Sequence, residues 1–188
     1  MLSSHPEVTV DFILFDRFVS RRSVEGLLTE LRMPGAPSGV FVDSPGGHFE
    51  FFSVLGPAIE RKGITMLAGD VRSAAVILFL LGHDRQVVPD SSFFFHEVRT
   101  LVRGEEITIA DLEAVEEYTE EMSGRPKEEY QEWVRQMNSA QDWFVEFISR
   151  KTGLSRSLFL NLMRSEATLS SGEAIHYGIA NRAVSYPR

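Results

Sequence analysis

Ser73 and the residues around it are the part of this sequence best suited to nucleophilic chemistry. Ser73 follows the predicted strand ITMLAG (64–69) and directly precedes eight uninterrupted apolar residues, 74–81, which are expected to form a buried helix. A serine at the start of a helix usually caps it by accepting a backbone N–H. A sharp turn from strand to helix would also expose the hydroxyl as a nucleophile, and the helix dipole favours negative charge there. This segment alone leaves cap and nucleophile both open.

Two further features add weaker signals. His96 ends the apolar segment SSFFFH (91–96), where a histidine is more often structural than catalytic. The turn SPGG (44–47) follows a predicted strand, and paired glycines let the backbone approach a ligand closely, with N–H groups that could hold an oxyanion. His48, directly after the glycines, is the other histidine of interest.

Composition excludes several classes of site. The chain has no cysteine, which excludes disulfides, thiol catalysis and cysteine-ligated metals. No histidine or acidic cluster at ligand spacing and no phosphate-binding glycine loop is present, so we expect neither a metal nor a cofactor. The net charge of −8 argues against nucleic acid and anionic membranes as partners. The longest apolar run is far shorter than the ~20 residues of a membrane span, and no secretory signal is visible; we therefore expect a soluble, cytoplasmic protein.

Strands and helices alternate in the first half of the chain. Strands are predicted at 8–15, 40–43, 64–69, 85–89 and 91–98, and helices at 20–33, 48–63 and 73–82. This alternation indicates crossover units around a parallel or mixed sheet. Gly46, Gly47 and Gly69 fall at strand-to-helix turns, where functional loops of such sheets gather.

The second half of the chain has a different pattern. Residues 105–121 contain eight acidic residues and no basic one, with apolar positions at helical spacing: Leu112, Val115, Tyr118 and Met122. After an interruption at 124–126, a second helical stripe precedes Gly153 and comprises Tyr130, Trp133, Met137, Phe144 and Ile148. We expect one domain over 1–188 with a helical arm at about 100–153, whose acidic face is solvated.

Four segments in this order resemble the ClpP family, the proteolytic subunit of the Clp protease. They are VFVDSPGG (40–47), AGDVRSAAVILFLLG (68–82), VVPDSSFFFH (87–96) and the segment 152–184, which contains Glu173-Ala174 and Tyr177-Gly178. The similarity extends from about Val8 through most of the chain except the arm. It implies an α/β fold of the ClpP/crotonase-like type, a spiral of strand–helix units with a protruding helical handle.

The resemblance also implies an activity and its residues. Ser73 takes the position of the nucleophile and His96 that of the base, while the N–H groups of Gly47 and Ala74 take the oxyanion hole. The position of the orienting acid falls on Glu166. The implied function is a serine endopeptidase that cleaves peptides or unfolded polypeptides without a cofactor. A homo-oligomeric ring is the implied assembly, and an ATP-dependent unfoldase is the partner that would feed larger substrates.

The sequence departs from the family pattern at four places. Glu166 stands where the family has aspartate, which leaves a Ser-His dyad as an alternative to a triad. Arg72 replaces a small residue before the serine and would bind a substrate carboxylate, point away or block the cleft. The first predicted core strand begins at Val8, so we expect the family's axial segment, associated with the partner ATPase, to be missing. The arm is about twenty residues longer than the family's handle, which joins two rings, so a stacked double ring is not expected with the usual geometry. Its start HEVRTLVRG (96–104) also lacks the glycine pair that the family has beside the substrate.

Three alternatives to an active peptidase stay open at this point. The first is a catalytically inactive ClpP-like subunit that acts in assembly or regulation, favoured by Arg72 and Glu166. The second is a crotonase-type acyl-CoA enzyme, although no CoA-binding pattern is evident. A signal-peptide peptidase relative is disfavoured because the sequence has neither a membrane anchor nor a lysine base.

Overall fold

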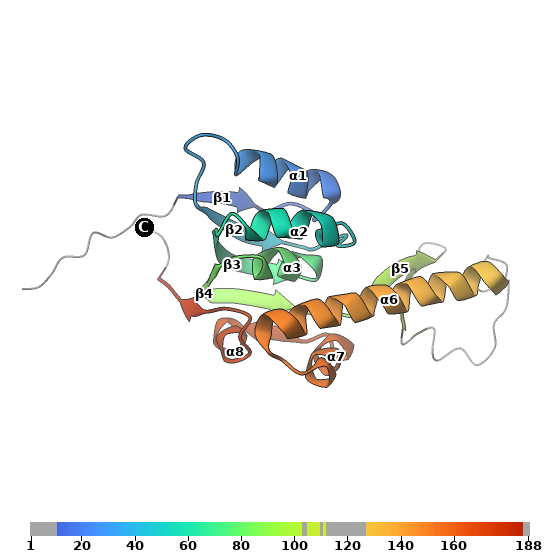
Figure 1. Cartoon of the computed structure of the whole chain (residues 1–188). Helices are drawn as coiled ribbons and strands as arrows, with labels where there is room; N and C mark the ends of the chain where they lie inside the picture. Colours follow the sequence, from blue (N-terminus) through green and yellow to red (C-terminus); the bar gives the residue numbers. More distant parts are fainter. Residues whose placement is uncertain (1–10, 103–104, 110, 112–126, 186–188) are drawn as a thin grey trace, which may run out of the picture. The chain divides into compact units, whose positions relative to one another are not determined.

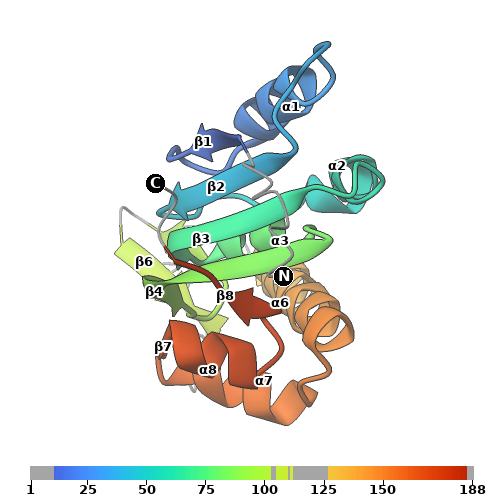
Figure 2. The same cartoon turned by 90° about the vertical axis from the view of Figure 1, so that its left-hand side faces the viewer.

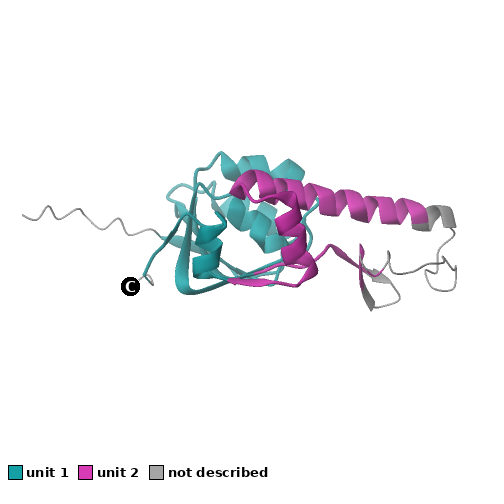
Figure 3. Ribbon diagram, turned by 90° about the horizontal axis from the view of Figure 1, so that it is seen from below, with its two compact units in different colours: residues 1–93, 170–188 teal, residues 94–169 magenta. Residues whose placement is uncertain are grey.

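The computed structural model describes residues 11–102, 105–109, 111 and 127–185. The chain divides into two compact units, one of residues 1–93 and 170–188 and the other of residues 94–169, coloured separately in Figure 3. Each unit is described by itself below. The acidic helix expected around Leu112, Val115, Tyr118 and Met122 lies outside the described residues. The single domain with a handle at about 100–153 stays a prediction.

The first unit alternates strands with helices, as the sequence predicts. Its sheet has the strand order β1-β2-β3-β4, with parallel pairing of β1 with β2 and of β2 with β3. Figures 1 and 2 show these strands stacked in order, with α1, α2 and α3 alongside them. The short strand β8 pairs in parallel with β4. The bounds are β1 Phe12–Phe15, α1 Arg21–Glu30, β2 Gly39–Ser44, α2 Phe52–Glu60, β3 Thr65–Arg72, α3 Ala74–Leu80, β4 Asp84–Phe94, α8 Ser171–His176 and β8 Arg182–Ala183.

Burial explains why these segments form these elements. Every residue of α3 is buried, which accounts for its uninterrupted apolar sequence. In α1, Val24, Leu27 and Leu28 are buried at helical spacing, and Ser20 begins the helix with a capping box. The core of this unit therefore lies between the sheet and its crossover helices.

β4 differs from the sequence prediction. The sequence predicts two strands that end and begin around Pro89, but the structure has one strand of 11 residues. Pro89 cannot donate a ladder hydrogen bond, and the buried Ser91 compensates for this irregularity. Its Oγ accepts from the Val88 N–H at 2.9 Å and donates to the Ala68 carbonyl of β3 at 2.6 Å. This hydrogen-bonded bridge lets the strand continue past the proline.

The second unit is built on a long helix. α6 (Lys127–Thr152) buries Met137, Phe144 and Ile148, and Gly153 follows it at φ 80°, which confirms the predicted stop and the later part of the predicted stripe. Trp133 in the earlier part is half-buried. After α6 come α7 (Arg156–Arg164) and β7 (Thr168–Ser170). The ring of Phe159 on α7 packs edge-on against Phe95 and Phe144, at centroid distances of 5.2 and 5.8 Å. These aromatic contacts form the centre of this unit.

The beginning of the expected helical arm is a β-hairpin. β5 (Arg99–Val102) pairs antiparallel with β6 (Glu105–Thr108), with Arg99 opposite Thr108. The composition of these strands explains the difference, because Thr100, Val102, Ile107 and Thr108 are β-branched and favour extended backbone.

Candidate active site

Ser73 lies in a strained turn between β3 and α3. β3 ends at Arg72 and α3 begins at Ala74, so Ser73 makes the whole connection. Its backbone has φ 51° and ψ −125°, a conformation that costs a residue other than glycine of order 1–3 kcal/mol. Its side chain makes no capping hydrogen bond. The interpretation of Ser73 as a helix cap is therefore wrong, and capping does not account for the strained turn.

The glycine turn lies against the Ser73 turn. Gly46 has φ 93°, and a Cβ added there would lie 2.6 Å from the Arg72 carbonyl oxygen and 2.8 Å from the Ser73 Cβ. Only a glycine allows this approach. The turn is fixed by the Val19 N–H, which donates to the Gly46 carbonyl at 2.7 Å, and by the His48 N–H, which donates to the Val19 carbonyl at 2.8 Å. The two turns predicted to supply nucleophile and amide donors thus meet.

The amide groups of Gly47 and Ala74 suit an anion. Gly47 follows Gly46 with φ 145°, and Ala74 is the first residue of α3. Within the described part of the chain, neither N–H donates a hydrogen bond. An N–H at a helix N-terminus beside a glycine turn is a suitable donor to developing negative charge.

Arg72 is held along its own strand. Its Nε donates to the Asp70 carboxylate at 2.7 Å, and the Ser92 hydroxyl donates to the other oxygen of Asp70 at 2.7 Å. The Asp70 N–H in turn donates to Asp43 at 2.9 Å. The sequence leaves three roles open for Arg72: to bind a substrate carboxylate, to point away or to block the cleft. Its pairing with Asp70 favours the second, a guanidinium that points along the sheet.

His96 lies in the second unit, two residues after the end of β4. Its half-buried ring packs near Phe94 at a centroid distance of 5.7 Å. Its Nδ1 lies 2.5 Å from the backbone carbonyl oxygen of Glu97. When Nδ1 donates to this carbonyl, the neutral ring keeps its lone pair on Nε2, which can then accept a proton. In that tautomer Nε2 is the ring nitrogen that would accept a proton.

Glu166 lies two positions after the last residue of α7, Arg164, in a backbone conformation that is usual for glycine. The Glu166 N–H donates to the Met163 carbonyl at 3.1 Å, and the Ala167 N–H donates to the Leu162 carbonyl at 3.0 Å. These two bonds form a Schellman motif, whose residue of positive φ is here Glu166 at 49°. Because the Phe95 N–H donates to the Ala167 carbonyl at 2.9 Å, His96 and Glu166 lie on neighbouring segments of this unit.

Replacing Glu166 tests whether this conformation is strained. Glu166→Gly should raise the free energy of unfolding by about 1 kcal/mol relative to Glu166→Ala, because only glycine adopts positive φ without cost. Both variants lose the same carboxylate, so their difference isolates the backbone. Urea denaturation followed by circular dichroism measures it. Equal stability of the two variants would show that Glu166 is not strained.

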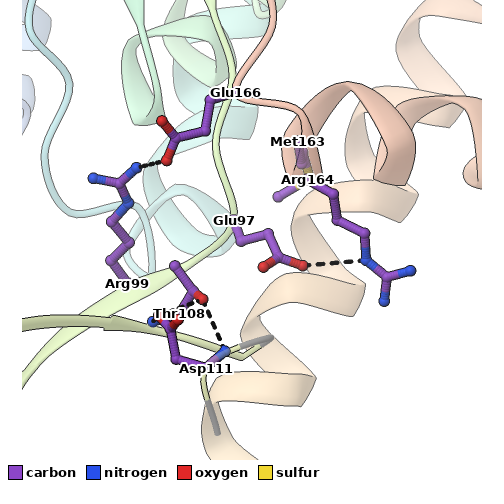
Figure 4. A pocket seen from close by; sticks show the side chains of 7 residues that line it. All are labelled: Glu97, Arg99, Thr108, Asp111, Met163, Arg164 and Glu166. Atoms are coloured by element: carbon purple, nitrogen blue, oxygen red, sulfur yellow. Dashed lines mark hydrogen bonds and ion pairs between the residues drawn. The ribbon is translucent and has the colours of Figure 1, made fainter. Parts of the chain in front are cut away.

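Charged residues surround a pocket of about 540 Å³ in the second unit (Figure 4). The Glu166 carboxylate forms an ion pair with Arg99, and the side chains of the two residues are 56% and 27% exposed, respectively. The buried Glu97 carboxylate is 3.4 Å from Arg164 Nε and 3.5 Å from Gln141 Nε2. Hydrogen bonds from the backbone and the hydroxyl of Thr108 hold the pKa of Asp111 below its usual value. The pocket is lined by Glu97, Arg99, Thr108, Asp111, Met163, Arg164 and Glu166.

Two kinds of feature are missing from the described residues. Among them, no group of three or more histidine or acidic side chains is arranged to hold a metal ion. None of the helices in the described ranges is both long and apolar enough to span a membrane.

Comparison with known proteins identifies the fold. A scan against protein-family models and a search of curated proteins find no match to the sequence. Among solved structures, the chain is similar to a mutant of ClpP1 from Listeria monocytogenes, with a TM-score of 0.65 over 93% of this chain and 91% of that chain. This chain has a ClpP-like fold. The predicted fold class is confirmed, and at 18% identity the likeness concerns the fold alone.

Sequence reasoning missed three residues that contact the candidate site residues. Asp70 binds Arg72, Arg99 binds Glu166, and the Glu97 carbonyl contacts His96. Asp70 lies two positions before Arg72 on the same strand, and this spacing places both side chains on one face. No sequence signal pairs Arg99 with Glu166, because 67 positions separate them.

Proposed function

We propose that this protein is a ClpP-like serine peptidase that cleaves peptides or unfolded polypeptides. Ser73 is the nucleophile, His96 the general base and Glu166 the acid that orients it. The observation that carries the proposal is the strained Ser73 turn, whose side chain caps nothing and whose backbone contacts the Gly46–Gly47 turn. Such strain at a strand-to-helix turn is characteristic of nucleophiles that must be exposed.

The proposed reaction follows from the roles of these groups. Ser73 Oγ attacks the carbonyl carbon of the scissile peptide bond while His96 Nε2 takes the hydroxyl proton. The N–H groups of Gly47 and Ala74 stabilise the oxyanion of the tetrahedral intermediate, and loss of one such donor costs about 3 kcal/mol. The C–N bond then breaks, and His96 returns the proton to the leaving amine. Water attacks the acyl-enzyme with His96 again as base, which releases the acid product and regenerates Ser73.

The role of Glu166 in this proposal needs a change of partner. In the described conformation its carboxylate binds Arg99, and His96 Nδ1 contacts the Glu97 carbonyl. A triad forms when Glu166 replaces that carbonyl at Nδ1. The alternative is a Ser73–His96 dyad, in which the Glu97 carbonyl accepts from Nδ1–H and so fixes the tautomer with the proton on Nδ1. The distance of 2.5 Å between Nδ1 and the carbonyl oxygen favours this alternative.

Assembly and partners belong to the same proposal. The ClpP-like fold and the sequence resemblance support a homo-oligomeric ring that acts in the cytoplasm on peptides without a cofactor. An ATP-dependent unfoldase is the proposed partner for larger substrates.

A second candidate function is a catalytically inactive ClpP-like subunit that acts in assembly or regulation. One observation favours it: the Glu166 carboxylate, which a triad would need for His96, is ion-paired with Arg99. Such a subunit would keep the fold and the ring but would not form an acyl-enzyme.

Covalent labelling separates the two functions. The purified full-length protein is treated with a serine-reactive fluorophosphonate, digested and analysed by mass spectrometry, while a panel of fluorogenic peptides measures hydrolysis. The peptidase should carry a stoichiometric adduct on Ser73, and turnover should fall in proportion to labelling. A protein that forms its oligomer but shows neither adduct nor turnover would be the inactive subunit.

A further inference from the structure

In the second unit the Glu166 carboxylate forms an ion pair with Arg99, and the same carboxylate is the group that a triad would need at His96. Arg99 Nη2 on β5 donates to Glu166 Oε1, at the C-terminal end of α7. Because the Schellman motif holds the backbone of Glu166 in place, a change of partner falls mainly on its side chain. The Phe95 N–H donates to the Ala167 carbonyl at 2.9 Å, so the backbone segments that carry His96 and Glu166 lie side by side.

His96 already has a partner for the ring nitrogen that the carboxylate would bind. Its Nδ1 contacts the backbone carbonyl of Glu97. The buried side chain of Glu97 in turn accepts hydrogen bonds from Arg164 and Gln141, which hold this residue in place. For Glu166 to orient His96, two contacts must therefore be exchanged, Arg99 with Glu166 and Glu97 with His96. The first contact is charge-assisted and the second is short. The structure shows the arrangement in which both are made, and a triad would require a second arrangement in which both are broken.

We propose that Arg99 is a positioning residue that withholds Glu166 from His96 and so sets the fraction of the enzyme with an assembled triad. This inference rests on the proposed function. The charged groups that share the pocket with Glu166 are Glu97, Arg99, Asp111 and Arg164, and of the two arginines only Arg99 pairs with Glu166. Arg164 pairs with Glu97 and lets the general effect of a nearby cation be separated from the specific hold of Arg99.

The test uses the pKa of His96, which a merely structural arginine would not change in this pattern. It is measured in the full-length protein by NMR titration of the imidazole Cε1–H signals, assigned with His96→Gln. Arg99→Gln should raise the pKa of His96 by about one unit, because the released carboxylate stabilises the imidazolium. In Arg99→Gln/Glu166→Gln, which has lost both partners, the pKa should return to within about 0.3 units of the wild-type value.

Arg164→Gln is the matched control. It removes the same charge from the same pocket but leaves the Arg99–Glu166 pair, and it should change the pKa of His96 by less than half as much. An equal rise in Arg164→Gln, or a rise that persists in the double variant, would overturn the proposal, because it would reflect only the loss of a nearby cation. If Arg99→Gln fails to fold, Arg99→Lys replaces it in the test. Lysine keeps the charge but binds the Glu166 carboxylate more weakly, so the pKa of His96 should rise in this variant too.

Peptide hydrolysis supplies a second readout. With the triad fraction increased, Arg99→Gln should raise kcat/KM at least about threefold. A fall in kcat/KM with an unchanged pKa of His96 would also overturn the proposal, because Arg99 would then present Glu166 productively. If no variant hydrolyses peptides or reacts with the fluorophosphonate, the proposed function fails, while the NMR titration still decides whether Arg99 controls the carboxylate.

Discussion

Ser73→Ala should lower kcat/KM for peptide hydrolysis by about 10⁴-fold or more. The hydroxyl is the attacking atom of the proposed reaction. Without it His96 has no hydroxyl proton to take and the amide donors have no oxyanion of a tetrahedral intermediate to stabilise. Loss of a nucleophile in related enzymes leaves only what the oxyanion hole and binding contribute. Steady-state hydrolysis of the best fluorogenic peptide measures the loss, and the fluorophosphonate adduct should disappear with it.

Two variants show whether such a loss comes from chemistry. Ser53→Ala removes an exposed hydroxyl of α2 that donates only to the Glu50 carbonyl, and its activity should equal that of the wild type. Ser73→Gly should be as inactive as Ser73→Ala but more stable, because glycine relieves the positive φ. If Ser73→Ala keeps more than about a tenth of the activity, Ser73 is not the nucleophile.

Apolar periodicity predicted most of the elements because burial determines them. The stripe of α1 and the buried residues of α6 lie where helical spacing places them, and the run 74–81 forms a helix buried on all sides. Periodicity failed to predict the extent of a strand where a hydrogen bond to a residue distant in sequence determines where that strand ends. β4 continues past Pro89 because Ser91 reaches the Ala68 carbonyl, 23 positions earlier in the chain. The pattern of a single segment cannot contain such a bond.

The candidate site was predictable in residue type but not in conformation. The motifs single out Ser73, the glycine pair, His96 and Glu166, and the structure places Ser73 and the glycines in contact within one unit. The positive φ of Glu166 could not be predicted, since the residue of positive φ in a Schellman motif is usually glycine. Its partner Arg99 was equally hidden, because ion pairs between distant segments follow from the fold and leave no local pattern.

Gly46→Ala should lower the free energy of unfolding by about 3 kcal/mol or more and reduce kcat/KM by about 10²-fold. Two separate costs add at this position. A φ of 93° strains any side chain, and the new methyl group would lie 2.6 Å from the Arg72 carbonyl oxygen and 2.8 Å from the Ser73 Cβ. Since the atoms that it meets belong to the Ser73 turn, relief of the clash must move the proposed nucleophile or the amide donors. Urea denaturation and peptide hydrolysis measure the two effects.

Gly63→Ala separates the strain from the clash. Gly63 also has a positive φ, 61°, but a Cβ there would meet nothing within 4 Å, so this variant carries only the conformational cost of about 1 kcal/mol. Its activity should stay at the wild-type level because the turn after α2 does not contact Ser73. The excess cost of Gly46→Ala over Gly63→Ala therefore measures the contact between the glycine turn and the Ser73 turn. If the two variants are equally stable and equally active, these turns do not meet in solution, and the proposed oxyanion hole loses its geometric basis.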